Sequence, residues 1–346
     1  MPGTYAVSAA LAALALGLAT AGPAAAGGEL RIYNWGEYTN PELVKKFEAE
    51  TGIKVTIDTY DSNETLLAKL KSGATGYDII VPGDYMVAIM VREGLLEPVD
   101  PKALPNFKNV DERWTTRYWD PDNLYSIPWQ WGTTAIQVNT DVVKNPPDSL
   151  SLLFDPPDEL KGKINMMRDV NDVMNMALRY LALPRCNSNP ADLRKVSDLL
   201  LQQKQWVRTY SSDPKQMIAS GDVAATMFWN GYAMRAHAEK PSLKYIYPKE
   251  GFTGWMDNVA VPKGAPNVEN AKVFLNFLMD PANAALISNY ARYMGGIKGA
   301  EKFMDPELLD APEIVIPAGL PEPEFVPPCD DKVVKLYDRI WTNLLR

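Results

Sequence analysis

The feature that most constrains the fold is a regular alternation of short β-type segments and amphipathic segments in the first third of the chain. Residues 30–33 predict a strand, and a helix over residues 41–50 follows it. Residues 53–57 predict a second strand, residues 63–71 a second helix and residues 77–81 a third strand. Strand–helix–strand order of this kind builds a parallel sheet with right-handed crossovers. The sequence therefore predicts an α/β fold.

The alternation restarts after Asn139, which indicates a second α/β unit. Its expected strands lie at 163–167, 224–229 and 245–247, and its expected helices at 172–181 and 192–204, while a further strand expected at 258–262 belongs with the first unit. A length of 346 residues also suits two units. We therefore predict two lobes, each a mainly parallel sheet flanked by helices. Residues 29–136 with 256–304 form the first lobe, and residues 137–255 with 305–346 form the second.

The first 26 residues differ in character from the rest of the chain. They contain no charged residue, carry an Ala/Leu run over residues 9–18 and end in three alanines before Gly27. A short apolar core followed by small residues is typical of a secretory signal peptide, although the usual basic residues near the start are missing. Gly and Pro interrupt the segment before it reaches membrane-spanning length. We predict a signal peptide over residues 1–26 and an exported protein of the periplasm.

Charge and the metal-binding residue types limit the partners. The net charge is −8, and binding to nucleic acid or to anionic membranes relies on basic patches, so we expect neither. The chain has a single histidine, His237, and no Cys-x-x-Cys spacing, so we expect no metal site and no cofactor. The two cysteines, Cys186 and Cys329, could form one bridge in an oxidising compartment. The sequence leaves open whether they approach each other.

Aromatic and acidic residues recur together where the expected strands end. In open α/β sheets, ligands lie beyond the carboxyl ends of the strands. Aromatic rings stack on methylene groups and attract ammonium groups by about 0.5–2 kcal/mol each, while carboxylates pair with the charges. The pattern therefore favours an elongated, cationic ligand. The segments that carry it are Trp35-Gly36-Glu37-Tyr38, Gly83-Asp84-Tyr85, Arg168-Asp169-Val170-Asn171-Asp172, Trp229-Asn230-Gly231, Trp255-Met256-Asp257 and Tyr293.

Several longer motifs carry a resemblance to a known family. They are Tyr33-Asn34-Trp35-Gly36-Glu37-Tyr38, Ser62-Asn63-Glu64-Thr65, Tyr77-Asp78-Ile79-Ile80-Val81-Pro82, Trp229-Asn230-Gly231, Tyr247-Pro248-Lys249-Glu250-Gly251 and Trp255-Met256-Asp257. Together with the segment at 47–55, they make the chain resemble the periplasmic polyamine-binding proteins of ABC importers. The likeness extends over essentially the whole chain after the signal peptide.

The resemblance implies a fold, a function and a set of site residues. Two α/β lobes of the type II periplasmic-binding-protein fold would close on a linear polyamine, spermidine or putrescine, without changing it chemically. The protein would act as a monomer and deliver its ligand to the membrane permease subunits of the importer. The implied aromatic box consists of Trp35, Tyr38, Tyr85, Trp229, Trp255 and Tyr293. The implied partners of the amino groups are Glu37, Asp169, Asp172 and Asp257.

Three departures from the family pattern leave the choice among amines open. Gly36 stands where spermidine binders often have a hydroxyl residue, and Gly83 stands where a serine is common. A glutamine that holds one amine in the spermidine binder has no clear counterpart near Phe325-Val326.

Other classes of protein compete with this interpretation. A secreted glycoside hydrolase would need only two carboxylates, one with a raised pKa. A nucleophilic enzyme would have to use His237, which lies in a polar stretch that we expect at a solvated helix end. Carbohydrate binders on the same fold also use aromatic rings, but they do not call for four acids. Ferric-iron binders commonly use a closely spaced tyrosine pair, which we do not find in the strand-end segments above.

Overall fold

The computed structural model describes residues 3, 27–73 and 76–346, so the predicted signal peptide lies almost wholly outside the described residues. The strands are β1 (Gly28–Trp35), β2 (Ile53–Tyr60), β3 (Ile79–Ile80), β4 (Ser126–Asn139), β5 (Ile164–Met166), β6 (Val207–Tyr210), β7 (Ala225–Trp229), β8 (Leu243–Ile246), β9 (Thr253–Ala260), β10 (Met294–Gly295) and β11 (Glu324–Phe325). The α-helices are α1 (Pro41–Thr51), α2 (Asn63–Lys71), α3 (Asp84–Arg92), α4 (Ser151–Phe154), α5 (Val170–Tyr180), α6 (Pro190–Lys204), α7 (Lys215–Ser220), α8 (Asn230–Glu239), α9 (Val268–Leu278), α10 (Pro281–Ala291), α11 (Pro306–Leu309) and α12 (Asp331–Leu345).

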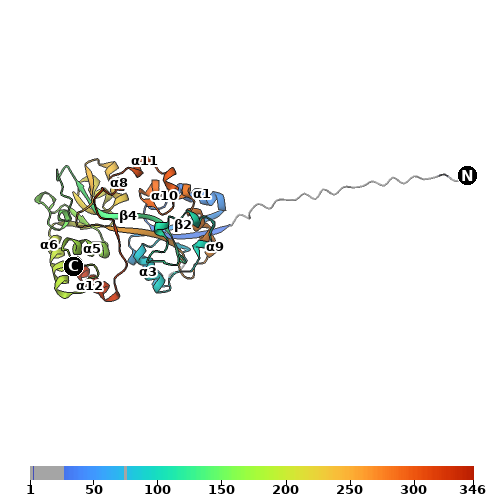
Figure 1. Ribbon diagram of the computed structural model, residues 1–346, viewed down its shortest axis with the longest axis horizontal. Helices are drawn as coiled ribbons and strands as arrows, with labels where there is room; N and C mark the ends of the chain where they lie inside the picture. Colours follow the sequence, from blue (N-terminus) through green and yellow to red (C-terminus); the bar gives the residue numbers. More distant parts are fainter. Residues whose placement is uncertain (1–2, 4–26, 74–75) are drawn as a thin grey trace.

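The strands form two parallel groups joined by long antiparallel strands. In one group β1 pairs in parallel with β2 and β3, and in the other β5 pairs in parallel with β6 and β7. Strands β4 and β9 lie between the groups and pair antiparallel with each other. We call the part around β1–β3, with α1, α3, α9 and α10, the first lobe. The part around β5–β8, with α5, α6, α8 and α12, is the second lobe, and Figure 1 shows β4 running between the two.

The observed order confirms the predicted two-lobed α/β fold. The sequence pattern predicts a strand at 134–139, preceded by a segment at 125–129, and in the structure one strand of 14 residues, β4, spans 126–139. Its first half pairs with β9 and its second half with β7 and β8, so one strand serves both lobes. The pairing of β4 with β9 is irregular between Pro128 and Trp131.

Two main hydrophobic cores correspond to the lobes. One contains Leu30, Phe47 and Phe274, and the other contains Phe154, Met176 and Leu200, all of them buried. The lobe boundaries predicted above remain a proposal. Leu308, Ala311 and Ile314, which the prediction assigns to the second lobe, pack in the first core.

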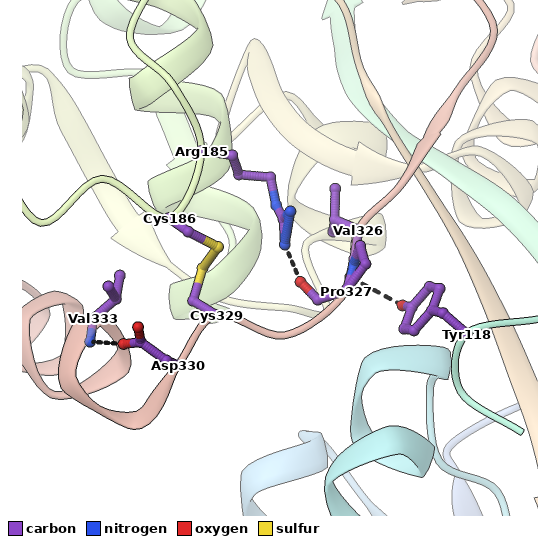
Figure 2. Close-up of a disulfide and its surroundings, with 8 residues drawn as sticks. All are labelled: Tyr118, Arg185, Cys186, Val326, Pro327, Cys329, Asp330 and Val333. Carbon is purple, nitrogen blue, oxygen red and sulfur yellow. Dashed lines mark hydrogen bonds between the residues drawn. A yellow bond between two sulfur atoms is a disulfide. The ribbon is translucent and has the colours of Figure 1, made fainter.

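A third connection runs from the first lobe to the second near the C-terminus. Strand β11 pairs in parallel with β9, and the chain then passes Val326 to reach Cys329. Cys329 is joined to Cys186 by a disulfide, with the Cα atoms 5.3 Å apart (Figure 2). The Tyr118 hydroxyl of the first lobe donates a hydrogen bond to the Val326 carbonyl (2.9 Å), and Arg185 of the second lobe donates to the Pro327 carbonyl. We call residues 324–329 the C-terminal strap.

Helix α12 follows the strap and packs on the second lobe, beside α5 and α6 (Figure 1). Its buried residues Val333, Tyr337 and Leu344 belong to the second core and lie on one face of the helix. Among the described residues, no helix has the length and apolar character needed to cross a membrane.

Candidate ligand-binding cavity

A cavity of about 950 Å³ lies where the two lobes face each other. The first lobe contributes the end of β1, the start of α3 and part of β9, while the second lobe contributes the start of α5 and the end of β7. All of the residues predicted to bind ligand line this one cavity: Trp35, Glu37, Tyr38, Tyr85, Asp169, Asp172, Trp229, Trp255, Asp257 and Tyr293. Their common location agrees with the prediction, and their role in binding remains a proposal.

Aromatic rings cover much of the cavity wall and connect the lobes. Trp35 of the first lobe meets Trp229 of the second edge to face, with ring centroids 6.1 Å apart. The Trp35 indole N–H donates to the Val81 carbonyl at 2.9 Å, which fixes the ring. On another wall Trp255 packs edge to face on Tyr293, with centroids 5.1 Å apart. These faces offer stacking surfaces to methylene groups and to cations.

Two glycines permit this placement of the rings. A Cβ atom at Gly132 would lie 2.6 Å from Trp255 Cζ2, and a Cβ atom at Gly231 would lie 2.5 Å from Tyr293 Cε1. Any larger residue at either position would push an aromatic wall out of place.

Asp257 is one of the first-lobe residues that line the cavity. It is buried, and the Tyr38 hydroxyl donates to its Oδ2 at 2.7 Å. Burial raises the pKa of Asp257 to about 7, and the Tyr38 hydrogen bond opposes that rise. The sequence places Trp255 and Asp257 before a strand, whereas both are part of β9 itself. Because alternate residues of a strand share a face, both side chains can reach the cavity.

Asp169 and Asp172 form an acidic pair at the start of α5. Asp169 caps the helix by accepting the backbone N–H of Asp172 at 2.9 Å, as the three-residue spacing predicts. Asp172 also accepts a hydrogen bond from the Thr134 hydroxyl at 3.0 Å. Burial raises the pKa of both carboxyl groups, and the charge of Asp172 raises that of Asp169 further. Capping accounts for one carboxylate and leaves the other turned to the cavity.

Glu37 differs from the other predicted acids because protein cations neutralise it. Its carboxylate lies 3.2 Å from Arg235 and 3.8 Å from Lys215, both of the second lobe. The Tyr232 hydroxyl of α8 donates to the neighbouring Gly36 carbonyl at 3.1 Å. Glu37 therefore joins the two lobes at the cavity rim.

Sequence reasoning missed two further acids of the cavity wall. Glu64 on α2 accepts the Tyr85 hydroxyl at 3.0 Å, and surrounding protein atoms raise its pKa to about 7, with the charge of Asp169 adding to the rise. Asp84 is the first residue of α3 and is buried. Both belong to motifs identified from sequence, and Asp84 carries the same signal as its neighbour Tyr85, namely an acid directly after a strand.

The structure offers no support for a histidine-based active site. His237 Nδ1 lies 2.6 Å from the Glu313 carboxylate, so the expectation that His237 is solvated is wrong in part. Glu313 is only 1% exposed, and the pair ties α8 to the loop after α11. His237 is not among the residues that line the cavity. Within the described ranges, no group of His, Cys, Asp and Glu side chains is arranged to hold a metal ion.

A cavity lined from two α/β lobes, with two long strands and a strap running between them, defines a solute-binding protein of the two-lobed type. The chain belongs to the bacterial extracellular solute-binding protein family, whose sequence pattern matches residues 42–316. Members of this family are substrate-binding proteins of transport systems.

Characterised relatives cover nearly all of the described chain. The spermidine/putrescine-binding periplasmic protein of Escherichia coli is 38% identical over 301 residues, which is 86% of this chain and 85% of the relative. The putrescine-binding periplasmic protein SpuD of Pseudomonas aeruginosa is 34% identical, with 96% of this chain and 97% of the relative covered. Among solved structures, the spermidine/putrescine substrate-binding protein PotD of Streptococcus pneumoniae superposes with a TM-score of 0.77 at 29% identity, over 92% of this chain and 99% of that one.

Proposed function

We propose that this protein captures a linear polyamine, spermidine or putrescine, in the periplasm and delivers it to the membrane permease subunits of an ABC importer. The observation that carries the proposal is that carboxylates from both lobes, Asp257 on one side and Asp169 with Asp172 on the other, line one aromatic cavity and form no direct ion pair with a lysine or arginine of the described residues. An ammonium group moved out of water requires an opposite charge and hydrogen-bond acceptors, which these carboxylates supply. The names of the relatives point to the same ligand class.

The ligand would lie along the aromatic walls with its charged ends at the acids. Methylene groups between two nitrogens gain from burial against Trp35, Trp229 and Trp255, and the nitrogens gain from cation–π contact with the same rings. Neutral sugars would also stack on these rings, but they would leave the buried carboxylates without a counter-charge. The number of acids therefore favours an amine over a sugar.

Isothermal titration of the protein lacking residues 1–26 tests the proposal. Spermidine and putrescine should each give saturable heat with one site per chain, and glucose should give none. Agmatine is informative because a guanidinium replaces one amino group while the rest of the ligand is kept. Heat from glucose together with silence toward every amine would overturn the proposed function.

Expression of the chain with residues 1–26 in a bacterium tests the location. We propose a monomer of the periplasm, released by cleavage of the segment over residues 1–26. Mass spectrometry of protein recovered from a bacterial periplasm should find a chain that starts near Gly27. A chain that keeps its first residues, or that remains in the cytoplasm, would contradict the proposed route.

A further inference from the structure

Asp84 is a buried carboxylate that one hydrogen bond leaves half satisfied. Its side chain is 2% exposed and lines the cavity wall. Oδ1 accepts the backbone N–H of Tyr85 at 2.7 Å, whereas Oδ2 accepts no hydrogen bond of good geometry from the described residues, although the Tyr118 hydroxyl and the Met256 N–H lie close enough to lower the pKa of the carboxyl group. A buried acceptor without a partner costs about 1–3 kcal/mol, and more when it is charged. Because Asp84 lines the cavity wall, a hydrogen-bond donor for Oδ2 can come from a ligand in the cavity.

Asp257 is a second carboxylate near Asp84, and like Asp84 it has no ion pair among the described residues. Gly83 and Asp257 form an isolated antiparallel β-bridge, and Asp84 is the residue that follows Gly83. A Cβ atom at Gly83 would lie 3.6 Å from Asp257 Oδ1, so the glycine keeps the space beside that oxygen open. In the described part of the chain, no lysine or arginine forms an ion pair with either carboxylate.

The remaining neighbours of Asp84 show where this pair lies in the cavity. Tyr118 is close enough to interact with Asp84, and its hydroxyl donates to the carbonyl of Val326, another cavity residue of the strap. Asp84 and Asp257 are therefore the acids on the first-lobe side of the cavity, next to the strap. Asp169 and Asp172 are the acids on the second-lobe side.

We propose that Asp84 is a further specificity-determining residue: with Asp257 it forms a two-carboxylate subsite that holds one charged nitrogen and favours triamines over diamines. The proposal rests on the proposed function. Four carboxylates in two pairs need more positive charge than a diamine carries, and a triamine leaves less of the buried negative charge uncompensated. A secondary ammonium in the middle of a triamine has two N–H donors, one for each carboxylate of the subsite.

Proton linkage gives the subsite its own signature. Burial is the main cause that raises the pKa of Asp84 to about 8, and the charge of Asp257 contributes to the rise, while the Tyr85 N–H, the Tyr118 hydroxyl and the Met256 N–H act against it. With the pKa of Asp257 at about 7, the empty subsite holds protons near neutral pH. A charged nitrogen that enters it must displace protons, so ligand binding releases them.

Titrations of the wild type and Asp84→Asn with spermidine and putrescine, in two buffers of different ionisation enthalpy, test the proposal. Asn keeps the shape and the Oδ1 acceptor but deletes the charge. We expect Asp84→Asn to lower spermidine affinity by about tenfold or more and putrescine affinity by less than about threefold, with fewer protons released per spermidine. Asp330→Asn is the matched control, because Asp330 caps α12 at 3.0 Å from the Val333 N–H and does not line the cavity.

Each outcome decides between separate claims. Equal losses for both amines, or no loss for either, would overturn this proposal and leave the proposed function standing. Absence of amine binding to the wild type would overturn both. If Asp84→Asn does not fold, the wild type alone still decides: spermidine must release more protons than putrescine, and equal release would overturn the subsite.

Discussion

Asp257 and Tyr38 show how a single charge can dominate the affinity. They come from distant parts of the chain and meet through a 2.7 Å hydrogen bond in a buried place. The Tyr38 hydroxyl stabilises the ionised form of Asp257 but does not neutralise it. The neutralising charge has to come from the ligand.

Asp257→Asn should lower polyamine affinity by about a hundredfold or more, because breaking a buried charge pair costs about 3–5 kcal/mol and each factor of ten is about 1.4 kcal/mol. Trp255→Leu should lower it less, since stacking and cation–π contact are lost while the charges stay paired. Titration calorimetry measures both. Unchanged affinity in Asp257→Asn would transfer the main role to Asp169 and Asp172.

Gly132→Ala should disturb the aromatic wall without changing any charge. The new Cβ atom would lie 2.3 Å from Asn230 Oδ1 and 2.6 Å from the Trp255 ring. Overpacking of this kind costs about 1–3 kcal/mol, so both the melting temperature and the affinity should fall. Gly36→Ala is the control, because Gly36 also lines the cavity but has no atom within 4 Å of a Cβ added there. Equal effects of the two substitutions would contradict the packing argument.

At the scale of elements, the loop after β1 and the helix α8 form a contact between the lobes. Glu37 has a positive φ of 52° and reaches Arg235, whose guanidinium also lies over the Tyr232 ring at 4.0 Å. The Glu37 side chain is 56% exposed, so solvent weakens the pair. The resemblance implies an amine-binding role for Glu37, and this geometry favours a role in holding the lobes together.

Glu37→Gln should change the affinity by no more than about fivefold, because exposed ion pairs contribute about 0–1 kcal/mol. A double-mutant cycle with Arg235→Gln should show coupling between the two side chains, since each substitution removes the same contact. A loss as large as that of Asp257→Asn, with no coupling to Arg235, would return Glu37 to the role of an amine ligand.

The disulfide fixes the strap at its second-lobe end (Figure 2). Replacing both cysteines by serine should lower the free energy of unfolding by about 2–4 kcal/mol and weaken ligand binding slightly, because Val326 of the strap lines the cavity. Denaturant titration measures the first effect and calorimetry the second. A reducing agent should have the same effect on the wild type and none on the serine variant. If the reducing agent also destabilised the serine variant, which has no disulfide, the agent would be acting on another part of the protein.

At the scale of the whole molecule, local patterns predicted most elements but not their long-range partners. Helix α2 and the starts of β2 and α1 match the predictions, because caps and apolar periodicity are local signals. The bond between Cys186 and Cys329 joins residues 143 apart in the sequence, and periodicity carries no information about such pairs. The predicted site residues do line one cavity, because strand ends gather at one edge of a sheet. Asp84 was not predicted as a site residue because its role depends on its burial and on its closeness to Asp257, and a sequence pattern shows neither.

Ligand affinity should rise with pH over a window set by the cavity acids whose pKa values are raised. Asp84 has a pKa of about 8, and Asp257 and Glu64 have pKa values of about 7, so these groups are largely protonated at pH 6 and ionised at pH 9. Alkyl ammonium groups have pKa values of about 10, like lysine, so the ligand stays charged over most of this range. Calorimetry from pH 6 to pH 8.5 should show the increase. A midpoint near pH 4, the ordinary value for Asp, would contradict the raised pKa values.

Stability without ligand should change in the opposite direction. These carboxyl groups have folded-state pKa values above their unfolded values, so their contribution to stability is fully present below about pH 4 and is lost progressively until the pH has passed about 7 to 8. The melting temperature of the empty protein should therefore fall between pH 6 and pH 9, and added spermidine should reverse the fall. An empty protein that gains stability over this range would show that other groups dominate.

The two acidic pairs lie on different lobes, and among the described residues neither pair has a lysine or arginine bound directly to it. At a pH above the raised pKa values of these acids, closing the lobes without a ligand would bring like charges together in a space with little water, where their repulsion is stronger than in bulk solvent. The ligand-free protein would therefore stay open, and only the ligand-bound protein would present the surface of the closed form. An importer that recognises this closed surface would hydrolyse nucleotide when it meets the ligand-bound protein and would not do so when it meets the ligand-free protein.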